Sequence, residues 1–119
     1  MQNVRLEYHV NDTVSVNQLV KFGFKMRSDN TYVLDKYLYG KIIKAKFIAD
    51  MIEHTITWRV YDCTNQQQYY AFYYNVNGDN NRVALKTIDE FVALIDAMIR
   101  ENIIVTDKTD KGDKKFDTK

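Results

Sequence analysis

The sequence predicts an α+β fold, a two-layer sandwich of one antiparallel sheet with two helices on one of its faces. Apolar and polar residues alternate in several runs of strand length between residues 4 and 76, which indicates four to five strands. Two segments carry helix-capping motifs beside apolar residues at helical spacing, one near each end of the chain. The predicted order is therefore β-α-β-β-β-β-α, and its short N-terminal and long C-terminal helices can cover only one sheet face.

The length of 119 residues suits a single domain, which we assign to residues 1–105. Residues 106–119, "TDKTDKGDKKFDTK", hold one large apolar residue, Phe116, among nine charges, and we expect a disordered charged tail there. No run approaches the length of a membrane span, and the first ten residues do not look like a signal peptide. With a single cysteine, Cys63, these features favour a cytoplasmic protein.

The first strand and the short helix are predicted from residues 4–23. "VRLEYHV" alternates over residues 4–10, the pattern of a strand with one solvated face. Ser15 then offers an N-cap, and Gln18 three residues later completes a capping box. Gly23 provides the left-handed stop, so a helix of about two turns is expected between Ser15 and Gly23.

A hairpin with a defined register is predicted around Gly40 and Lys41, because glycine accepts the positive φ of a type II′ turn. This register joins Asp35 to Lys46 and leaves one face apolar except for Lys36. The expected cross-strand pairs are Leu38 with Ile43, Lys36 with Ala45, Leu34 with Phe47, Tyr32 with Ala49, Tyr39 with Ile42, Tyr37 with Lys44, and Val33 with Ile48.

Two further strands are predicted over residues 55–62 and 69–76. In the first, alternation turns Trp58 toward the core and Arg59 and Tyr61 away from it. In the second, "YYAFYYNV", it places Phe72 inside, under the last helix, and Tyr69 and Tyr73 outside.

The closing helix is predicted from "TIDEFVALIDAMIREN". Thr87 is the expected N-cap and Glu90 closes a capping box. The apolar residues at helical spacing are Ile88, Phe91, Val92, Ile95, Met98 and Ile99.

Catalytic and metal-binding motifs are not apparent, so we expect neither an enzyme nor a cofactor. His9 and His54 fall in different elements, and with Cys63 they do not make a credible zinc set. Asp89 and Glu90 sit in the first turn of the predicted helix, where capping and the helix dipole explain them.

The succession of "FGFK", "YVL", "YG", "RVYD" and a closing amphipathic helix resembles a small α+β segment that accompanies MmcQ/YjbR-type bacterial proteins. The similarity covers roughly residues 19–102. It implies a bacterial or phage origin and a family with a proposed DNA-binding role, and it brings no catalytic motif. The aromatic run at 69–74 departs from the pattern.

The face of the sheet turned away from the helices is the candidate binding surface. Its predicted members are Tyr37, Tyr39, Lys44, Lys46, Arg59, Tyr61, Tyr69 and Tyr73. Tyrosine and arginine are typical of protein interfaces, whereas aromatic rings among cations also suit the stacking of single-stranded nucleic acid. In the simplest interpretation these residues are only good strand formers that shield an open sheet.

Charge helps to order these interpretations. Residues 1–105 hold twelve basic and twelve acidic side chains, whereas strong nucleic-acid binding usually needs a markedly basic domain. Residues 21–46 nonetheless hold seven basic side chains and two acidic ones, a local charge of +5. We therefore expect a non-catalytic module that binds a protein partner or itself. Weak binding of single-stranded DNA or RNA by the same face is the alternative, and no membrane contact is expected.

Overall fold

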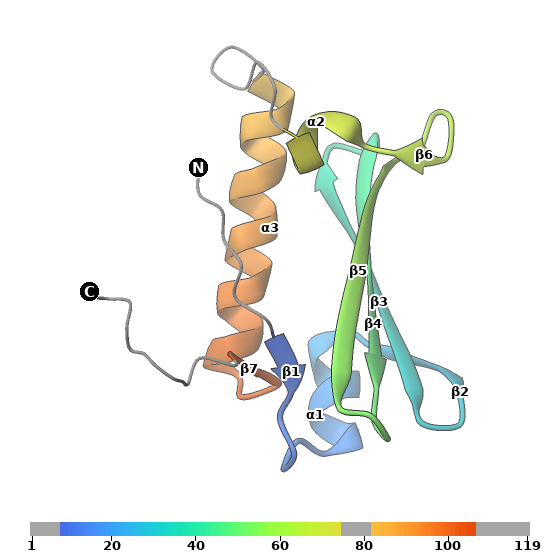
Figure 1. Cartoon of the computed structure of the whole chain (residues 1–119), viewed down its shortest axis with the longest axis vertical. Coiled ribbons are helices and arrows are strands. Elements are labelled where there is room, and N and C mark those ends of the chain that lie inside the picture. The colour runs from blue at the N-terminus through green and yellow to red at the C-terminus, as the bar shows by residue number, and fades with distance from the viewer. Residues whose placement is uncertain (1–7, 75–81, 107–119) are drawn as a thin grey trace.

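A computed structural model describes residues 8–74 and 82–106 (Figure 1). The chain is α+β, with a mostly antiparallel open sheet and a long C-terminal helix, as predicted. The elements in chain order are β1 (Tyr8–Val10), α1 (Val16–Phe22), β2 (Lys25–Ser28), β3 (Thr31–Tyr39), β4 (Ile43–Asp50), β5 (Thr55–Asp62), β6 (Gln67–Gln68), α2 (Tyr70–Tyr74), α3 (Arg82–Arg100) and β7 (Ile104–Thr106).

The sheet is larger than the four to five strands predicted. It has seven strands in the order β2-β3-β4-β5-β1-β7, and β6 pairs with β5 beside this path. The additional strands are β2, β6 and β7, all of four residues or fewer. Such short strands show no repeated alternation, so the pattern could not reveal them. Residues 4–7 of the first predicted strand lie outside the described residues.

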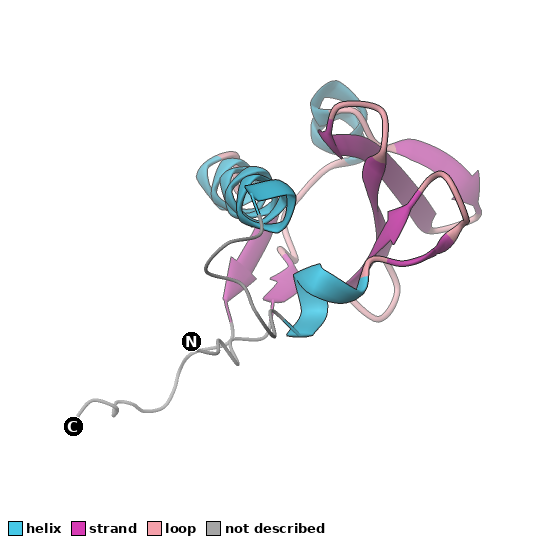
Figure 2. Cartoon of the chain, turned by 90° about the horizontal axis from the view of Figure 1, so that it is seen from above, coloured by secondary structure: helices cyan, strands magenta, loops and turns pink. Residues whose placement is uncertain are grey.

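Helices α1 and α3 line one side of the sheet, and no described helix stands on the other side of β3, β4 and β5 (Figure 1). Seen from above, the sheet curves, so that β1 and β7 come to lie beside α3 while the longer strands form the opposite wall (Figure 2). One face of β3, β4 and β5 is thus packed against the helices and the other is left open.

Helix α1 has the predicted ends. The Ser15 hydroxyl accepts the Gln18 N–H at 3.1 Å, and the Gln18 side chain accepts the Ser15 N–H at 3.0 Å, which is a capping box. Gly23 ends the helix with φ +127°, and a Cβ built there would lie 3.1 Å from the Leu34 side chain. The positive φ favours glycine at this position, and a larger residue would also have to displace the Leu34 side chain by a few tenths of an ångström.

The β3–β4 hairpin has the predicted register over most of its length, including Asp35 opposite Lys46 and Leu34 opposite Phe47. Gly40 has φ +52°, and the Ile42 N–H donates to the Tyr39 carbonyl at 3.0 Å, closing the turn. The prediction was wrong at its end, because the register shifts between Tyr37 and Tyr39. Tyr39 therefore pairs with Ile43, not with Ile42, and the Leu38–Ile43 pair does not form.

The core under the helices is built around an aromatic cluster. Phe91 of α3 stacks on Phe47 of β4 at 5.5 Å between ring centroids and meets Trp58 of β5 edge-on at 5.3 Å. Phe72 approaches the other side of Phe91 at 5.0 Å. The predicted packing of Phe72 with the last helix is confirmed, although Phe72 does not come from a strand.

The strand predicted over residues 69–76 is wrong. Residues 67–68 form the short strand β6 and residues 70–74 form the single-turn helix α2. The Tyr69 N–H donates to the Val60 carbonyl at 2.9 Å, and the Val60 N–H donates to the Tyr73 hydroxyl oxygen at 2.8 Å. These contacts satisfy the edge of β5 without a further strand, so they override the strand propensity of the tyrosines. Val76 lies outside the described residues.

The predicted N-cap of the last helix is also wrong. Helix α3 begins at Arg82, so Thr87 is an interior residue and its side chain is completely buried. The Thr87 hydroxyl has no hydrogen-bond partner within the described residues. The T-x-x-E pattern was misleading because the preceding turn of helix, residues 82–86, is held by its own packing on the α2 side of the core.

The boundary between the domain and its tail moves by one residue. Thr106 is the last residue of β7 and pairs with Tyr8 of β1, so the domain extends past residue 105. The remainder of the predicted tail, residues 107–119, lies outside the described residues.

Candidate functional site

Three adjacent rows that cross β3, β4 and β5 on their open face form the candidate surface, and we call these nine residues the ladder face; a fourth row, Thr31, Asp50 and Thr55, continues the open face beyond them and is not included in this name. Its rows follow from the antiparallel register. They are Val33, Ile48 and Thr57; then Asp35, Lys46 and Arg59; then Tyr37, Lys44 and Tyr61. The face is thus apolar at one end, charged in the middle and aromatic at the other end.

The aromatic row contains two cation–π pairs. The Lys44 ammonium lies 5.2 Å from the ring centroid of Tyr37, and the Arg59 guanidinium lies 4.9 Å from that of Tyr61. Arg59 also donates to the carbonyl of Gln66 at 3.0 Å, in the turn between β5 and β6. The orientation of this arginine is therefore fixed before any partner arrives.

The charged row contains one ion pair and a surplus of positive charge. Lys46 lies 3.7 Å from the Asp35 carboxylate, and both side chains are about two-fifths exposed. A pair with this length and exposure contributes little to stability. Counting Lys44, Lys46 and Arg59 against Asp35, the ladder face has a net charge of +2.

Five of the eight predicted site residues share this face: Tyr37, Lys44, Lys46, Arg59 and Tyr61. Tyr61 is nevertheless buried, at 8% exposure. The other three are tyrosines that are partly buried and packed against the core cluster, namely Tyr39, Tyr69 and Tyr73. The prediction that Tyr69 and Tyr73 lie on the open face is wrong, because helix α2 folds them against β5.

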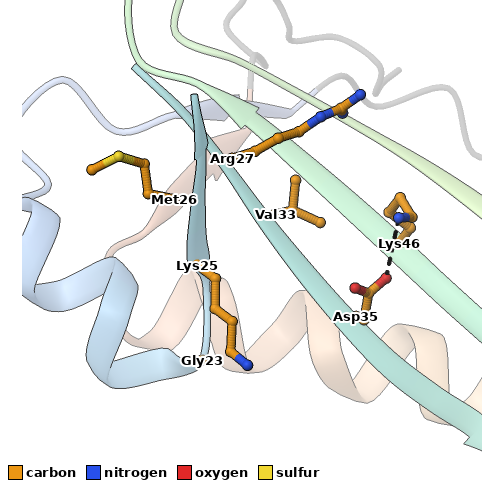
Figure 3. A pocket seen from close by; sticks show the side chains of 7 residues that line it. All are labelled: Gly23, Lys25, Met26, Arg27, Val33, Asp35 and Lys46. Carbon is orange, nitrogen blue, oxygen red and sulfur yellow. Dashed lines mark ion pairs between the residues drawn. The ribbon is translucent and has the colours of Figure 1, made fainter. Parts of the chain in front are cut away.

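A hollow of about 420 Å³ adjoins the ladder face where β2 meets β3 (Figure 3). Sequence reasoning missed this feature because the strand β2 was not predicted. The excess of basic residues between positions 21 and 46 was the available signal. The residues that line the hollow are Gly23, Lys25, Met26, Arg27, Val33, Asp35 and Lys46.

Side chains with catalytic potential are scattered. Within residues 8–74 and 82–106, no three histidine, cysteine or acidic side chains gather closely enough to hold a metal ion. His54 lies 3.9 Å from Asp12 at the surface, and Cys63 is a half-buried free thiol. The Thr64 hydroxyl and then its backbone N–H, both donating to Asp62, hold the pKa of that carboxyl below its usual value.

The pKa of Tyr8 is raised, first by burial and then by the negative charge of Asp96 on α3. Neither Tyr8 nor Asp62 is among the residues that line the hollow between β2 and β3.

Comparison with known proteins supports the fold alone. No protein-family model matches the sequence, and no curated protein matches it significantly. The structure is similar to the crystal structure of a DUF1831 family protein from Lactobacillus plantarum, with a TM-score of 0.64 and 15% identity over 84% of this chain and 86% of that one. These comparisons do not bear on the resemblance to MmcQ/YjbR-type proteins, which stays a prediction. No described helix has the length and apolar character needed to cross a membrane.

Proposed function

We propose that this protein is a non-catalytic binding module that holds a protein partner on its ladder face. The observation that carries the proposal is the pair of cation–π contacts, Lys44 on Tyr37 and Arg59 on Tyr61, on a sheet face without a covering helix. Tyrosine and arginine are enriched in interface cores because each contributes a large contact area. Arg59 is already held by the Gln66 carbonyl, so less side-chain entropy is lost on binding.

The same cation–π contacts favour a protein as the binding partner over single-stranded nucleic acid. A base that stacks on a tyrosine needs a free ring face. Lys44 lies on one face of Tyr37, and Tyr61 is both covered by Arg59 and largely buried. The face thus offers a stacked base little aromatic surface, while its fixed cations remain available to acidic side chains. Nucleic-acid binding is kept as the alternative outcome of the test below.

The setting of this function is part of the proposal. We place the protein in the cytoplasm of a bacterium or in a phage. The single cysteine suits a reducing compartment, and the similar structure of known source is bacterial.

Photo-cross-linking in the native host tests the function. Benzoylphenylalanine in place of Tyr37 is compared with the same residue in place of Val92 on α3, because the two side chains are equally exposed, at 50% and 49%. We expect a protein adduct from position 37 that position 92 does not give. The purified partner should bind the wild-type chain, and Lys44→Glu should weaken it while Lys86→Glu on α3 should not.

The same experiment can refute the proposal. The proposal is wrong if positions 37 and 92 give equal yields of adduct. It is also wrong if the partner binds Lys44→Glu with the same affinity as the wild-type protein. An adduct destroyed by nuclease would establish the nucleic-acid alternative instead. That outcome should be accompanied by a steep fall of affinity with salt.

A further inference from the structure

Three cationic side chains line the hollow between β2 and β3, together with the apolar side chains of Met26 and Val33. Lys25 and Arg27 come from β2, Lys46 comes from β4, and Val33 of β3 lies among them (Figure 3). Asp35 is the one acidic side chain among the residues that line it. In Figure 3, Met26 and Arg27 point to opposite sides of β2, and Arg27 extends toward the β4 side.

Two of the three cations have no acidic partner among the described residues. Within the described residues, Lys25 and Arg27 make no ion pair, whereas Lys46 shares Asp35 at 3.7 Å. Like charges that line one hollow repel one another, and the attraction of an entering anion to each of them offsets this repulsion. Because the ion pair of Lys46 is long and partly solvated, Lys46 can turn from Asp35 to a ligand at little cost.

We infer that this hollow is an anion-binding subsite that receives a glutamate or aspartate side chain from an extended acidic segment of the protein partner. The inference rests on the proposed function, because the hollow shares Val33, Asp35 and Lys46 with the ladder face. A carboxylate would accept hydrogen bonds from Arg27 and Lys25, while the neighbouring apolar side chain of the segment rests on Val33. The partner class is thus an acidic peptide with interspersed apolar residues.

The geometry favours an acidic protein segment over other anions. A hollow of about 420 Å³ has the size of small-ligand sites, and it opens directly onto the ladder face. A segment running along the ladder face would therefore meet Arg59 and Lys44 after it leaves the hollow. Strand β2 itself is short, charged and bulged, which protects its outer edge from pairing, so the contact is expected through side chains and not by strand addition.

Residue-resolved NMR titration tests the subsite. The probe is a blocked peptide of alternating glutamate and valine, and its control has glutamine in place of every glutamate. We expect the glutamate peptide to shift the amides of Lys25, Arg27 and Lys46, and the glutamine peptide to leave them unchanged. Lys25→Gln with Arg27→Gln should weaken binding at least about tenfold, the loss expected for about 1.4 kcal/mol of charge-assisted hydrogen bonding.

The matched control removes one lysine and one arginine elsewhere, as Lys86→Gln with Arg100→Gln on α3, and should leave the affinity within about twofold because surface charges distant from a ligand act weakly. Equal weakening by both double variants would overturn the subsite, since only the overall charge would matter. Shifts confined to other residues, or equal binding of the glutamine peptide, would also overturn it. Tighter binding of oligothymidylate by the same residues would replace the acidic segment with nucleic acid.

The subsite and the proposed function can fail separately. If the partner cross-links at position 37 but binds the Lys25→Gln, Arg27→Gln variant with unchanged affinity, the anion-binding subsite is wrong and the ladder face remains the proposed interface. If the glutamate peptide binds the hollow but no partner cross-links at position 37, the subsite stands and the ladder face is not an interface.

Discussion

The two faces of strands β3, β4 and β5 differ in what holds their side chains. On the face toward α3, Phe47 is fully buried and touches both Phe91 and Trp58. On the ladder face, Tyr37 is half exposed, and its ring is in contact with the ammonium group of Lys44, its own cross-strand neighbour. The first face therefore contributes burial energy from several elements, whereas the second contributes short-range contacts within the sheet. We therefore expect substitutions at the exposed ladder-face positions, unlike those at buried Tyr61, to cost the domain little stability.

The most severe test of this difference is truncation on either face of the same hairpin. Phe47→Ala should cost about 3–5 kcal/mol of unfolding free energy, since it empties the centre of the aromatic cluster. Tyr37→Ala should cost no more than about 1 kcal/mol because little contact is lost. Denaturant melts of the two variants measure both values. Similar losses for the two would mean that the ladder face is also part of the stabilising core.

Helix α2 provides a second comparison, between two tyrosine hydroxyls. Tyr73→Phe removes the acceptor of the Val60 N–H and should destabilise by about 1–3 kcal/mol, the cost of an unpaired buried amide. Tyr37→Phe serves as the matched control and should change stability by less than about 0.5 kcal/mol at its exposed position. Chemical denaturation decides the question. Equal stability of the two variants would show that the Val60 N–H finds another acceptor.

Thr87, a buried residue of helix α3, allows a further comparison between a buried and an exposed threonine. Its hydroxyl is buried without a hydrogen bond in the described structure, and valine has nearly the same shape. Thr87→Val should stabilise the protein by about 1 kcal/mol, because the cost of burying the hydroxyl disappears. Thr57→Val on the exposed ladder face is the control and should be near neutral. A loss of stability in Thr87→Val would indicate that the hydroxyl has a partner.

The smallest expected effect lies at the exposed end of β5. Thr64→Val removes the hydroxyl that donates to Asp62 at 2.6 Å, so the pKa of Asp62 should rise toward its ordinary value. A carboxyl with a lowered folded pKa stabilises the fold above its ordinary pKa. That contribution fades as the pH falls through the lowered folded value, and it should be smaller in the variant. An NMR titration of Asp62 in both proteins measures the change, and identical titration curves would contradict it.

Local chemistry explains what could be predicted from the sequence. The hairpin register followed from Asp35 facing Lys46 and from a glycine at the turn, and α1 followed from Ser15, Gln18 and Gly23. Ser15, Gln18 and Gly23 lie within one short helix, and Asp35 and Lys46 lie on two strands that are joined directly by one tight turn, so in both cases the spacing encodes the interaction.

The predictions that were wrong depend on contacts between segments, which spacing along the chain does not reveal. Helix α2 depends on Val60, which is thirteen positions away from Tyr73, and tyrosines alone favour a strand. The T-x-x-E pattern at Thr87 misled because a capping motif is also tolerated inside a helix that packing supports. The predicted surface holds on β3, β4 and β5, where alternation is regular, but Tyr39 leaves it at the register shift and Tyr69 and Tyr73 leave it where the chain departs from the sheet.

The hydrogen bonds that join Val60 to Tyr69 and Tyr73 also bear on the tendency of the fold to aggregate. Within residues 8–74 and 82–106, strand β5 pairs with β1 at Thr55 and with β6 at Tyr61 and Asp62, and α2 with Tyr69 occupies the backbone groups of Val60 on the edge between them, which protects that position from intermolecular pairing. A helix of a single turn is easily displaced. Agitation or mild heating should therefore convert Tyr73→Phe into β-rich aggregates before the rest of the domain unfolds, and the Val60 amide should become the first in β5 to exchange with solvent deuterium.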